Sequence, residues 1–444
     1  MRVNAIDLFC GVGGLTYGIQ SAGINVVAGF DFESACKFAY EKNNDAIFVH
    51  KDIKELEDGE LEKYYPKDTD IKVMIGCAPC QPFSTYSHRY RGSGTSNDKM
   101  DLLDYFGKQI QLVKPQIVSM ENVPQLAKEA VFERFTKLLK KEGYKVTWKI
   151  AYAPAYGIPQ NRKRLLLLAS KLGEISFEKE LTQEEYPTVR QAIGDLPKLK
   201  AGETDPGDPL HTARNLTKIN LQRIRSSKPG GTWRDWDKSL LPNCYKKKSG
   251  KSFASVYGRL EWDKPSSTIT TQFPGYGNGR FGHPEQDRAL SLREGAILQS
   301  FPRDYEFIED TSQLSTQKIA MQIGNAVPPK LGEVIGKSIL MHLKIDTEYV
   351  ISLDFDKDFS LSGNADVREI KSILKQHGLQ YEDNILNNYG GALRTIKDMR
   401  NSLAHGNISF EDNGRKLTVD DLERYKNKTF ECIEYFIKIV NSSY

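Results

Sequence analysis

The chain has 444 residues, of which 39% are hydrophobic and 27% are charged, the balance of a soluble globular protein. A chain of this length usually folds into two or three domains. It has no run of eighteen apolar residues, and its first residues lead directly into a strand-like segment. We therefore expect no membrane span, no signal peptide and a cytoplasmic location. The net charge of +4 permits a polyanionic partner without requiring one.

The first third of the chain alternates β-branched segments with segments of helical periodicity. Strands are expected over residues 2–9, 24–31, 71–77, 115–120, 144–153 and 164–170, and helices after the glycine-rich turn and over 32–43, 100–113 and 131–143. This alternation indicates βαβ units on a mostly parallel sheet. Ligands of such sheets bind at the carboxyl ends of the strands.

The remainder of the chain changes character twice. Residues 171–300 are rich in Gly, Pro, Lys and Arg and lack sustained periodicity, which indicates an irregular domain with a basic surface. Helical periodicity returns over 290–301 and 316–343. A polar stretch then precedes a final segment of about a hundred residues, a size suited to a further domain.

The segment DLFCGVGG places glycines between a strand and a helix, as a nucleotide-binding loop does. Thr16 departs from the dinucleotide fingerprint, which needs a small residue at that position. Asp31 ends the next strand at a distance suited to ribose hydroxyls, so an adenosine-type ligand is favoured over one that carries a pyrophosphate. Asp52 ends a third strand and is suited either to an adenine amine or to a solvated loop.

The segment GCAPCQPFS contains two of the six cysteines, Cys77 and Cys80, in a CxxC pair that follows an apolar strand. Such a pair is a set of metal ligands, a redox couple, or one reactive thiol beside a second cysteine. Six cysteines in so long a chain do not indicate a disulfide framework, so reduced thiols are expected.

These two segments are followed in order by MENVPQL, PQNRKRLLLL, LSLREGAILQSFP and QIGNAVPPKL. Over residues 1–342 the chain thus resembles the DNA cytosine-C5 methyltransferases. The resemblance implies an α/β fold with a Rossmann-like, S-adenosylmethionine-dependent catalytic domain, an irregular target-recognition domain and an all-helical C-terminal domain. The expected parts are a catalytic domain (1–185), a target-recognition domain (186–300), a helical return (301–344), a linker (345–365) and a helical domain (366–444).

The resemblance also implies the S-adenosylmethionine site. Asp31 is expected to hold the ribose, Phe32 to pack on the adenine, and Asp52 to accept from its amine. The full set of expected cofactor-binding residues is Phe9, Gly11, Gly13, Gly14, Leu15, Asp31, Phe32, Asp52, Ile53, Pro79, Leu102 and Asn325.

The same resemblance makes Cys80 the nucleophile, because a thiolate adds to C6 of cytosine and thereby activates C5. Glu121 is expected to hydrogen-bond or protonate N3, and Arg162 and Arg164, which alternate along a strand entry, to bind the base carbonyl and the carboxylates from one face. No second close Cys or His pair supports a metal site, and the prolines beside Cys80 do not suit a redox couple. Cys77 is then a packing residue, and Cys77→Ala is expected to keep most activity.

Duplex DNA is the expected substrate, with the target cytosine flipped out of the helix. Basic side chains of the recognition domain are expected to contact phosphates, and polar ones to read base edges. The candidate DNA-binding residues are Gln81, Ser84, Arg234, Lys246, Lys247 and Lys248.

In the C-terminal segment, MRNSLAHG resembles the R-x4-H pattern of HEPN domains, with Arg400 and His405 as the pair expected in an RNase. The alternatives are a dimerisation or docking bundle, and a His405 that only stabilises a helix end. We expect a DNA (cytosine-5-)-methyltransferase of a restriction–modification or related defence system, with a cognate endonuclease and a second copy as candidate partners. The rivals are a tRNA methyltransferase and a DNA-binding regulator that has lost catalysis.

Overall fold

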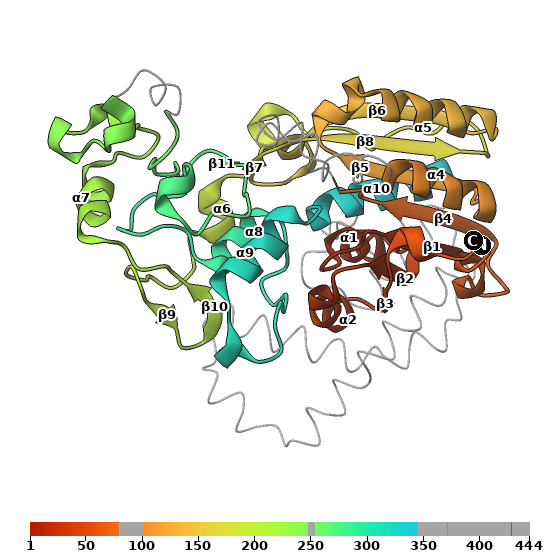
Figure 1. Cartoon of the computed structure of the whole chain (residues 1–444), viewed down its shortest axis with the longest axis horizontal. Coiled ribbons are helices and arrows are strands. Elements are labelled where there is room, and N and C mark those ends of the chain that lie inside the picture. The colour runs from red at the N-terminus through yellow and green to blue at the C-terminus, as the bar shows by residue number, and fades with distance from the viewer. Residues whose placement is uncertain (80–101, 247–253, 344–370, 372–427, 429–444) are drawn as a thin grey trace. The chain divides into compact units, whose positions relative to one another are not determined.

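The computed structural model describes residues 1–79, 102–246 and 254–343, together with positions 371 and 428. Residues 1–347 form one compact unit, built on a seven-stranded sheet in the order β3-β2-β1-β4-β5-β8-β6 (Figure 1). Of the seven strands of this sheet, β8 runs opposite to the other six, so the prediction of a mostly parallel sheet is confirmed. The strands are β1 (Val3–Leu8), β2 (Asn25–Asp31), β3 (Ile47–His50), β4 (Ile71–Gly76), β5 (Ile117–Asn122), β6 (Lys145–Tyr152) and β8 (Lys163–Ser170).

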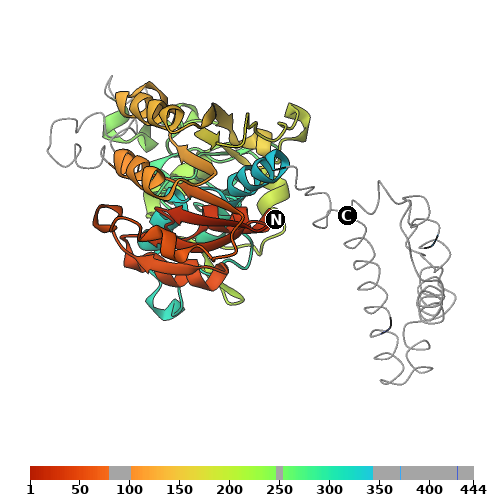
Figure 2. The ribbon, with the colours of Figure 1, turned by 90° about the vertical axis from the view of Figure 1, so that its right-hand side faces the viewer.

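Helices cover both faces of this sheet. Figure 2 shows the orange α4 and α5 on one side and the blue-green α10 on the other. Strand β8 illustrates the alternation that two covered faces require, because Leu165 and Leu167 join the core under α4 and α5 while Leu166 and Leu168 join the core under α1 and α10. The helices are α1 (Gly14–Ser21), α2 (Lys37–Asn43), α4 (Leu102–Val113), α5 (Ala130–Lys141) and α10 (Pro329–His342).

Helices α1 and α10 pack backbone against backbone. A Cβ on Gly18 would lie 1.9 Å from the carbonyl oxygen of Pro329, and one on Gly332 would lie 2.6 Å from that of Leu15. Glycine is therefore needed on both helices at their crossing. The segment 316–343 is helical as predicted, but it divides into α9 (Thr316–Asn325) and α10, because Pro328 and Pro329 cannot continue the first helix.

Residues 186–300, the predicted target-recognition domain and called the recognition region below, are largely irregular where the structure describes them (green in Figure 1). Its strands form only two-residue or short ladders, and β11 extends from this region to pair with β7 of the catalytic part. A small core of Trp233, Trp236 and Tyr245 replaces extensive secondary structure. The elements of this region are α6 (Val189–Ile193), β9 (Thr204–Asp205), β10 (Asp208–Thr212), α7 (Lys218–Ser226), β11 (Ser266–Ser267) and α8 (Leu292–Leu298), and β7 (Gln160–Asn161) precedes it in the chain.

Residues 348–444 form the second unit. The proposed linker at 345–365 and helical domain at 366–444 fall almost entirely outside the described residues, as do Arg400 and His405, and stay predictions. Among the described parts of the chain, no helix is long and apolar enough to cross a membrane.

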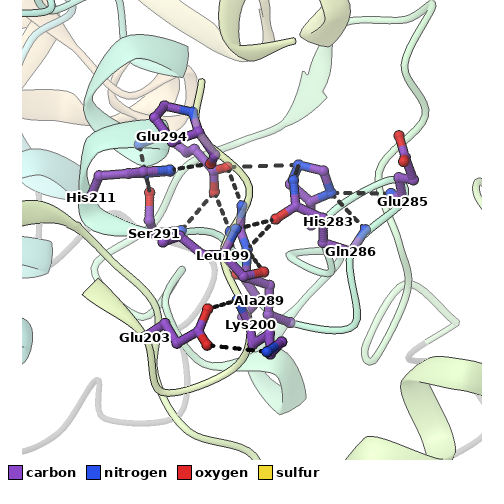
Figure 3. A network of polar contacts seen from close by, with 12 residues as sticks. Leu199, Lys200, Glu203, His211, His283, Glu285, Gln286, Ala289, Ser291 and Glu294 are labelled. Carbon is purple, nitrogen blue, oxygen red and sulfur yellow. Dashed lines mark hydrogen bonds and ion pairs between the residues drawn. The ribbon is translucent and has the colours of Figure 1, made fainter. Parts of the chain in front are cut away.

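A buried ionic network stabilises the base of the recognition region (Figure 3). Both nitrogens of the Arg288 fork lie 2.7 Å from the two oxygens of Glu294, and neither side chain is more than 1% exposed. The backbone N–H of Ser291 also donates to Glu294, and His283 Nε2 lies 3.7 Å away. Burial opposes the charge on Glu294, but the Arg288 hydrogen bonds outweigh it and lower the pKa to about 2.

The Glu294→Gln variant is expected to lose about 3 kcal/mol of stability, because Arg288 remains buried without its counter-charge. The pKa of Glu294 is lowered on folding, so its charge stabilises the fold above pH 4.5 and the benefit is lost as pH falls toward about 2. Thermal melting across this pH window should show wild type and variant converging at the acidic end. The control is Glu285→Gln, which alters an exposed carboxylate of the same network, and equal melting of both variants would contradict the prediction.

Candidate active site

The chemically important residues lie along one edge of the sheet. The parallel strands β1 to β5 end at this edge, and the antiparallel β8 begins there, since Asn122 of β5 pairs with Leu165 of β8. Strands β2 and β4 flank β1 on opposite sides, which is the switch point where doubly wound sheets bind their ligands.

A cavity of about 290 Å³ opens at the ends of β1, β2 and β3. Its lining combines apolar surface from Leu8 and Phe30 with polar groups from the strand ends. It gathers six of the twelve predicted cofactor residues, namely Phe9, Asp31, Phe32, Asp52, Ile53 and Leu102. The exposed ring of Phe32, 61% accessible, presents a face on which an aromatic ligand can stack.

Asp31 is held in place by the backbone around it. Its two carboxylate oxygens accept from the N–H groups of Gly11 and Glu33, each at 2.9 Å. Burial raises its pKa, while these two hydrogen bonds favour the charged form and limit the rise. The carboxylate is therefore fixed at the cavity wall, as an acceptor of ligand hydroxyls must be.

The glycine loop shapes the cavity without all of its members lining it. Gly11 has a φ of +52° and an open space where a Cβ would lie, whereas a Cβ on Gly13 or Gly14 would collide with Asn44 or Val327 at 2.3 Å. Gly13 and Gly14 thus allow the loop to pack closely against Asn44 and Val327. Of the other predicted cofactor residues, Leu15 is buried against α10, Pro79 is partly buried after β4, and Asn325 is exposed at the end of α9.

Glu121 and Arg164 form an ion pair at the same edge of the sheet, although neither side chain lines the cavity. Glu121 is 3% exposed near the end of β5, and its Oε1 lies 2.8 Å from Arg164 Nε at the start of β8. Its other oxygen, Oε2, accepts from the thiol of Cys77 at 2.9 Å. Cys80, the predicted nucleophile, lies outside the described residues, three positions beyond Cys77 in the chain.

Arg162 makes different contacts from Arg164. It is 4% exposed and donates to the carbonyl oxygens of Ile269 at 3.1 Å and Gly324 at 3.4 Å. Gln160, two residues earlier, donates to Gln299 Oε1 at 2.6 Å and to the carbonyl oxygen of Leu298. These bonds join Arg162 to the recognition region and α9, whereas Arg164 pairs with Glu121.

The predicted DNA-binding residues are only partly described. Arg234 is exposed on the recognition region, with its guanidinium 5.5 Å from the ring centre of Trp233, which itself stacks on Tyr245. This geometry holds a cation on an aromatic support at the surface. The remaining candidates lie outside the described side chains: Gln81, Ser84, Lys246, Lys247 and Lys248.

Sequence reasoning missed two basic residues of the cavity, Lys51 and Lys54. Both residues flank Asp52 and Ile53, which were predicted to bind the cofactor. Their position directly after β3 would have been enough to predict them as well. Lys51 pairs with Glu60 at 2.7 Å, which neutralises part of the positive charge at this wall.

The model of the C-5 cytosine-specific DNA methylase family matches residues 3–341, which include every strand and helix of the site. The chain therefore belongs to the C-5 cytosine-specific DNA methylases. It is 50% identical over 343 residues to the Type II methylase M.HgiDII of Herpetosiphon aurantiacus, covering 76% of this methylase and 95% of that one. It is 34% identical to the Type II methyltransferase M1.HphI of Haemophilus parahaemolyticus, covering 77% and 87%.

Solved structures agree with this methylase in fold. A prophage-encoded E. coli protein described as a DNA modification methyltransferase matches with a TM-score of 0.59 at 22% identity, over 77% of the methylase and 100% of that chain. The methyltransferase EhMeth of Entamoeba histolytica matches with a TM-score of 0.53 at 18% identity, over 77% and 99%. A HEPN-like family model matches residues 311–444, which confirms the predicted relationship of the C-terminal segment.

The methylase uses S-adenosylmethionine as its methyl donor, as its family does. The cavity fits this molecule, because its apolar walls and the exposed Phe32 suit an adenine ring and the fixed carboxylate of Asp31 suits ribose hydroxyls. Six of the twelve residues predicted to hold it line this one cavity, and their role in binding stays a prediction.

Asp31→Ala is expected to weaken S-adenosylmethionine binding by about tenfold to a hundredfold, the usual effect of losing hydrogen bonds to a charged group. Titration calorimetry of the full chain measures this without depending on activity. The control is Glu33→Gln, since Glu33 is an exposed carboxylate two residues away and does not line the cavity. Equal affinities for Asp31→Ala and wild type would show that the ribose is held elsewhere.

Proposed function

We propose that this methylase modifies C5 of one cytosine within a defined duplex DNA sequence, through a covalent adduct between Cys80 and C6. The observation that best supports the proposal is the buried pair of Glu121 and Arg164, placed at the same sheet edge as the cofactor cavity. The addition of a thiolate to C6 of cytosine needs a carboxyl group at the N3 side of the ring, and Glu121 is a buried carboxyl group whose Oε2 contacts Cys77, three residues before Cys80 in the chain.

The chemistry begins from the weakness of cytosine C5 as a nucleophile. The thiolate of Cys80 adds to C6, and the ring electrons then reach C5. Glu121 donates to N3 and so stabilises the charge that the addition creates. S-adenosylmethionine supplies the methyl group that C5 takes up. Loss of the C5 proton to solvent and departure of the Cys80 thiolate then restore the aromatic ring.

Neither Glu121 nor Cys80 can reach a base that is stacked in a duplex. We therefore propose that the target cytosine is flipped into the site, with the recognition region holding the surrounding DNA. The aromatic support under Arg234 favours a phosphate or base contact at that surface. The names of the Type II relatives support a role in restriction and modification, with a cognate endonuclease as partner.

Two rival functions predict different substrates or no reaction. A tRNA methyltransferase would need no large duplex-reading module, and the long irregular stretch of residues 186–300, with its basic clusters, favours DNA because it is suited to such a module. A regulator without catalysis would not need to retain a buried Glu121 paired with Arg164, because burying an ion pair is costly. An RNase activity of Arg400 and His405, and dimerisation through the C-terminal domain, stay predictions.

The decisive experiment expresses the full chain in a host that lacks DNA methylation and sequences its DNA by bisulfite conversion. C5-methylcytosine at one recurring sequence is the expected result, and it identifies the target site. Methylation of tRNA with unmodified DNA would support the RNA rival, and no methylation of either would support the regulator.

A further inference from the structure

The thiol of Cys77 contacts the carboxylate that the reaction needs. Glu121 offers two oxygens, and its Oε1 is engaged by Arg164 at 2.8 Å. Its Oε2 accepts from Cys77 Sγ at 2.9 Å. With Glu121 only 3% exposed, the protein holds both oxygens in a site largely closed to water.

Hydrogen bonds on both sides hold the backbone that carries this thiol. The N–H of Cys77 donates to the carbonyl oxygen of Leu8 at 3.2 Å, directly after Gly76 pairs with Leu8 in the sheet. One residue later, the carbonyl oxygen of Ala78 accepts from Asn122 Nδ2 at 3.0 Å. The segment that leads to Cys80 is thus tied to both neighbouring strands, and Cys77 lies between the two ties.

The two partners of Glu121 differ in strength. Arg164 holds Oε1 by the attraction of opposite charges in an ion pair that lacks hydrogen-bond geometry, whereas Cys77 holds Oε2 through a thiol, among the weakest donors in proteins. An arriving cytosine needs one Glu121 oxygen for its N3 side, and Oε2 is the oxygen whose present partner is easier to displace. A thiol at this position keeps a buried oxygen satisfied before the base binds and gives it up at little cost.

We propose that Cys77 is a positioning residue for Glu121, orienting its carboxylate through Oε2 until the target base takes the place of the thiol. This inference rests on the proposed function. It replaces the expectation from the sequence that Cys77 only packs at the strand end, although its side chain does also contact the apolar core.

The test compares Cys77→Ala and Cys77→Ser in the full chain by steady-state methyl transfer to duplex DNA. Cys77→Ala is expected to lower kcat about fivefold, the effect of one weak hydrogen bond, with the KM for DNA and for S-adenosylmethionine unchanged. Cys77→Ser, which has a donor at the same place, should recover part of the kcat lost in Cys77→Ala but not all of it, because a hydroxyl holds Oε2 more strongly than a thiol and costs more to displace. Cys77→Val removes the donor but fills the space of the sulfur, so it leaves no cavity. Its kcat should fall as far as that of Cys77→Ala, which shows that the loss does not come from a destabilised fold.

The matched control is Cys36→Ala, which removes a buried sulfur that packs in a separate cluster and does not contact Glu121. Its melting temperature is expected to fall while its kcat stays at the wild-type value. Unchanged kcat in both Cys77→Ala and Cys77→Val, together with an inactive Glu121→Gln, would overturn the positioning role of Cys77 and leave the proposed role of Glu121 standing. Full activity in Glu121→Gln would instead overturn the role of Glu121 in the proposed function, and the inference with it.

Discussion

Cys80→Ser is expected to reduce methyl transfer by more than about a thousandfold, because a serine hydroxyl is not ionised near neutral pH and adds poorly to C6. The measurement is incorporation of labelled methyl groups into duplex DNA that carries the sequenced target site. A second measurement traps the adduct directly. Fluorine at C5 cannot leave as a proton does, so wild-type enzyme should stay covalently bound to DNA containing 5-fluorocytosine, and Cys80→Ser should not.

The loss must be separated from a loss of cofactor binding. Serine differs from cysteine by one atom and keeps the size of the side chain, so Cys80→Ser should bind S-adenosylmethionine with wild-type affinity by calorimetry. Cys77→Ala serves as the neighbouring comparison, with an expected loss of only about fivefold. Methyl transfer by Cys80→Ser near the wild-type rate would remove the thiolate from the mechanism.

Glu121→Gln is expected to lower the single-turnover rate of methyl transfer by about a hundredfold to a thousandfold. Glutamine keeps the size of the side chain but cannot pass a proton to N3, and its neutral amide no longer balances Arg164. The control is Glu133→Gln, which neutralises an exposed carboxylate on α5 and should leave the rate unchanged. Wild-type rates in Glu121→Gln would show that N3 is served by another group.

The pair also separates catalysis from stability. Arg164→Met leaves the Glu121 carboxylate buried without its counter-charge, so the melting temperature should fall together with the rate. The double variant Glu121→Gln and Arg164→Met removes both charges and should recover much of the melting temperature but none of the rate. Recovery of both would mean that the pair is structural.

The sequence predicted the cavity residues well where they follow strands directly. Phe9, Asp31 and Asp52 each come within a residue or two of the end of an apolar strand, and parallel strands bring such positions to one edge. The contact of Cys77 with Glu121 was not predictable in this way. It depends on β4 and β5 being neighbours in the sheet, and the alternation of strands and helices does not specify their order.

Arg162 shows a second limit. From its spacing it was expected to share a face with Arg164, yet its described bonds go to Ile269 and Gly324, more than a hundred residues away in the chain. Pairings of that sequence separation depend on how the recognition region and α9 return to the sheet, which local patterns do not record. The irregular character of the recognition region was predicted, but its buried pair of Arg288 and Glu294 was not.

The bonds around Gln160 and Arg162 have a consequence for how this enzyme could change its target. The side chains belong to the catalytic strand region, namely Asn161 and Arg162, whereas the recognition region offers them backbone carbonyl oxygens, those of Pro265 and Ile269. Every residue type carries such an oxygen. A recognition region of altered sequence can therefore pack against the catalytic strands through the same hydrogen bonds. Its DNA specificity can change by substitution of side chains while this contact is kept.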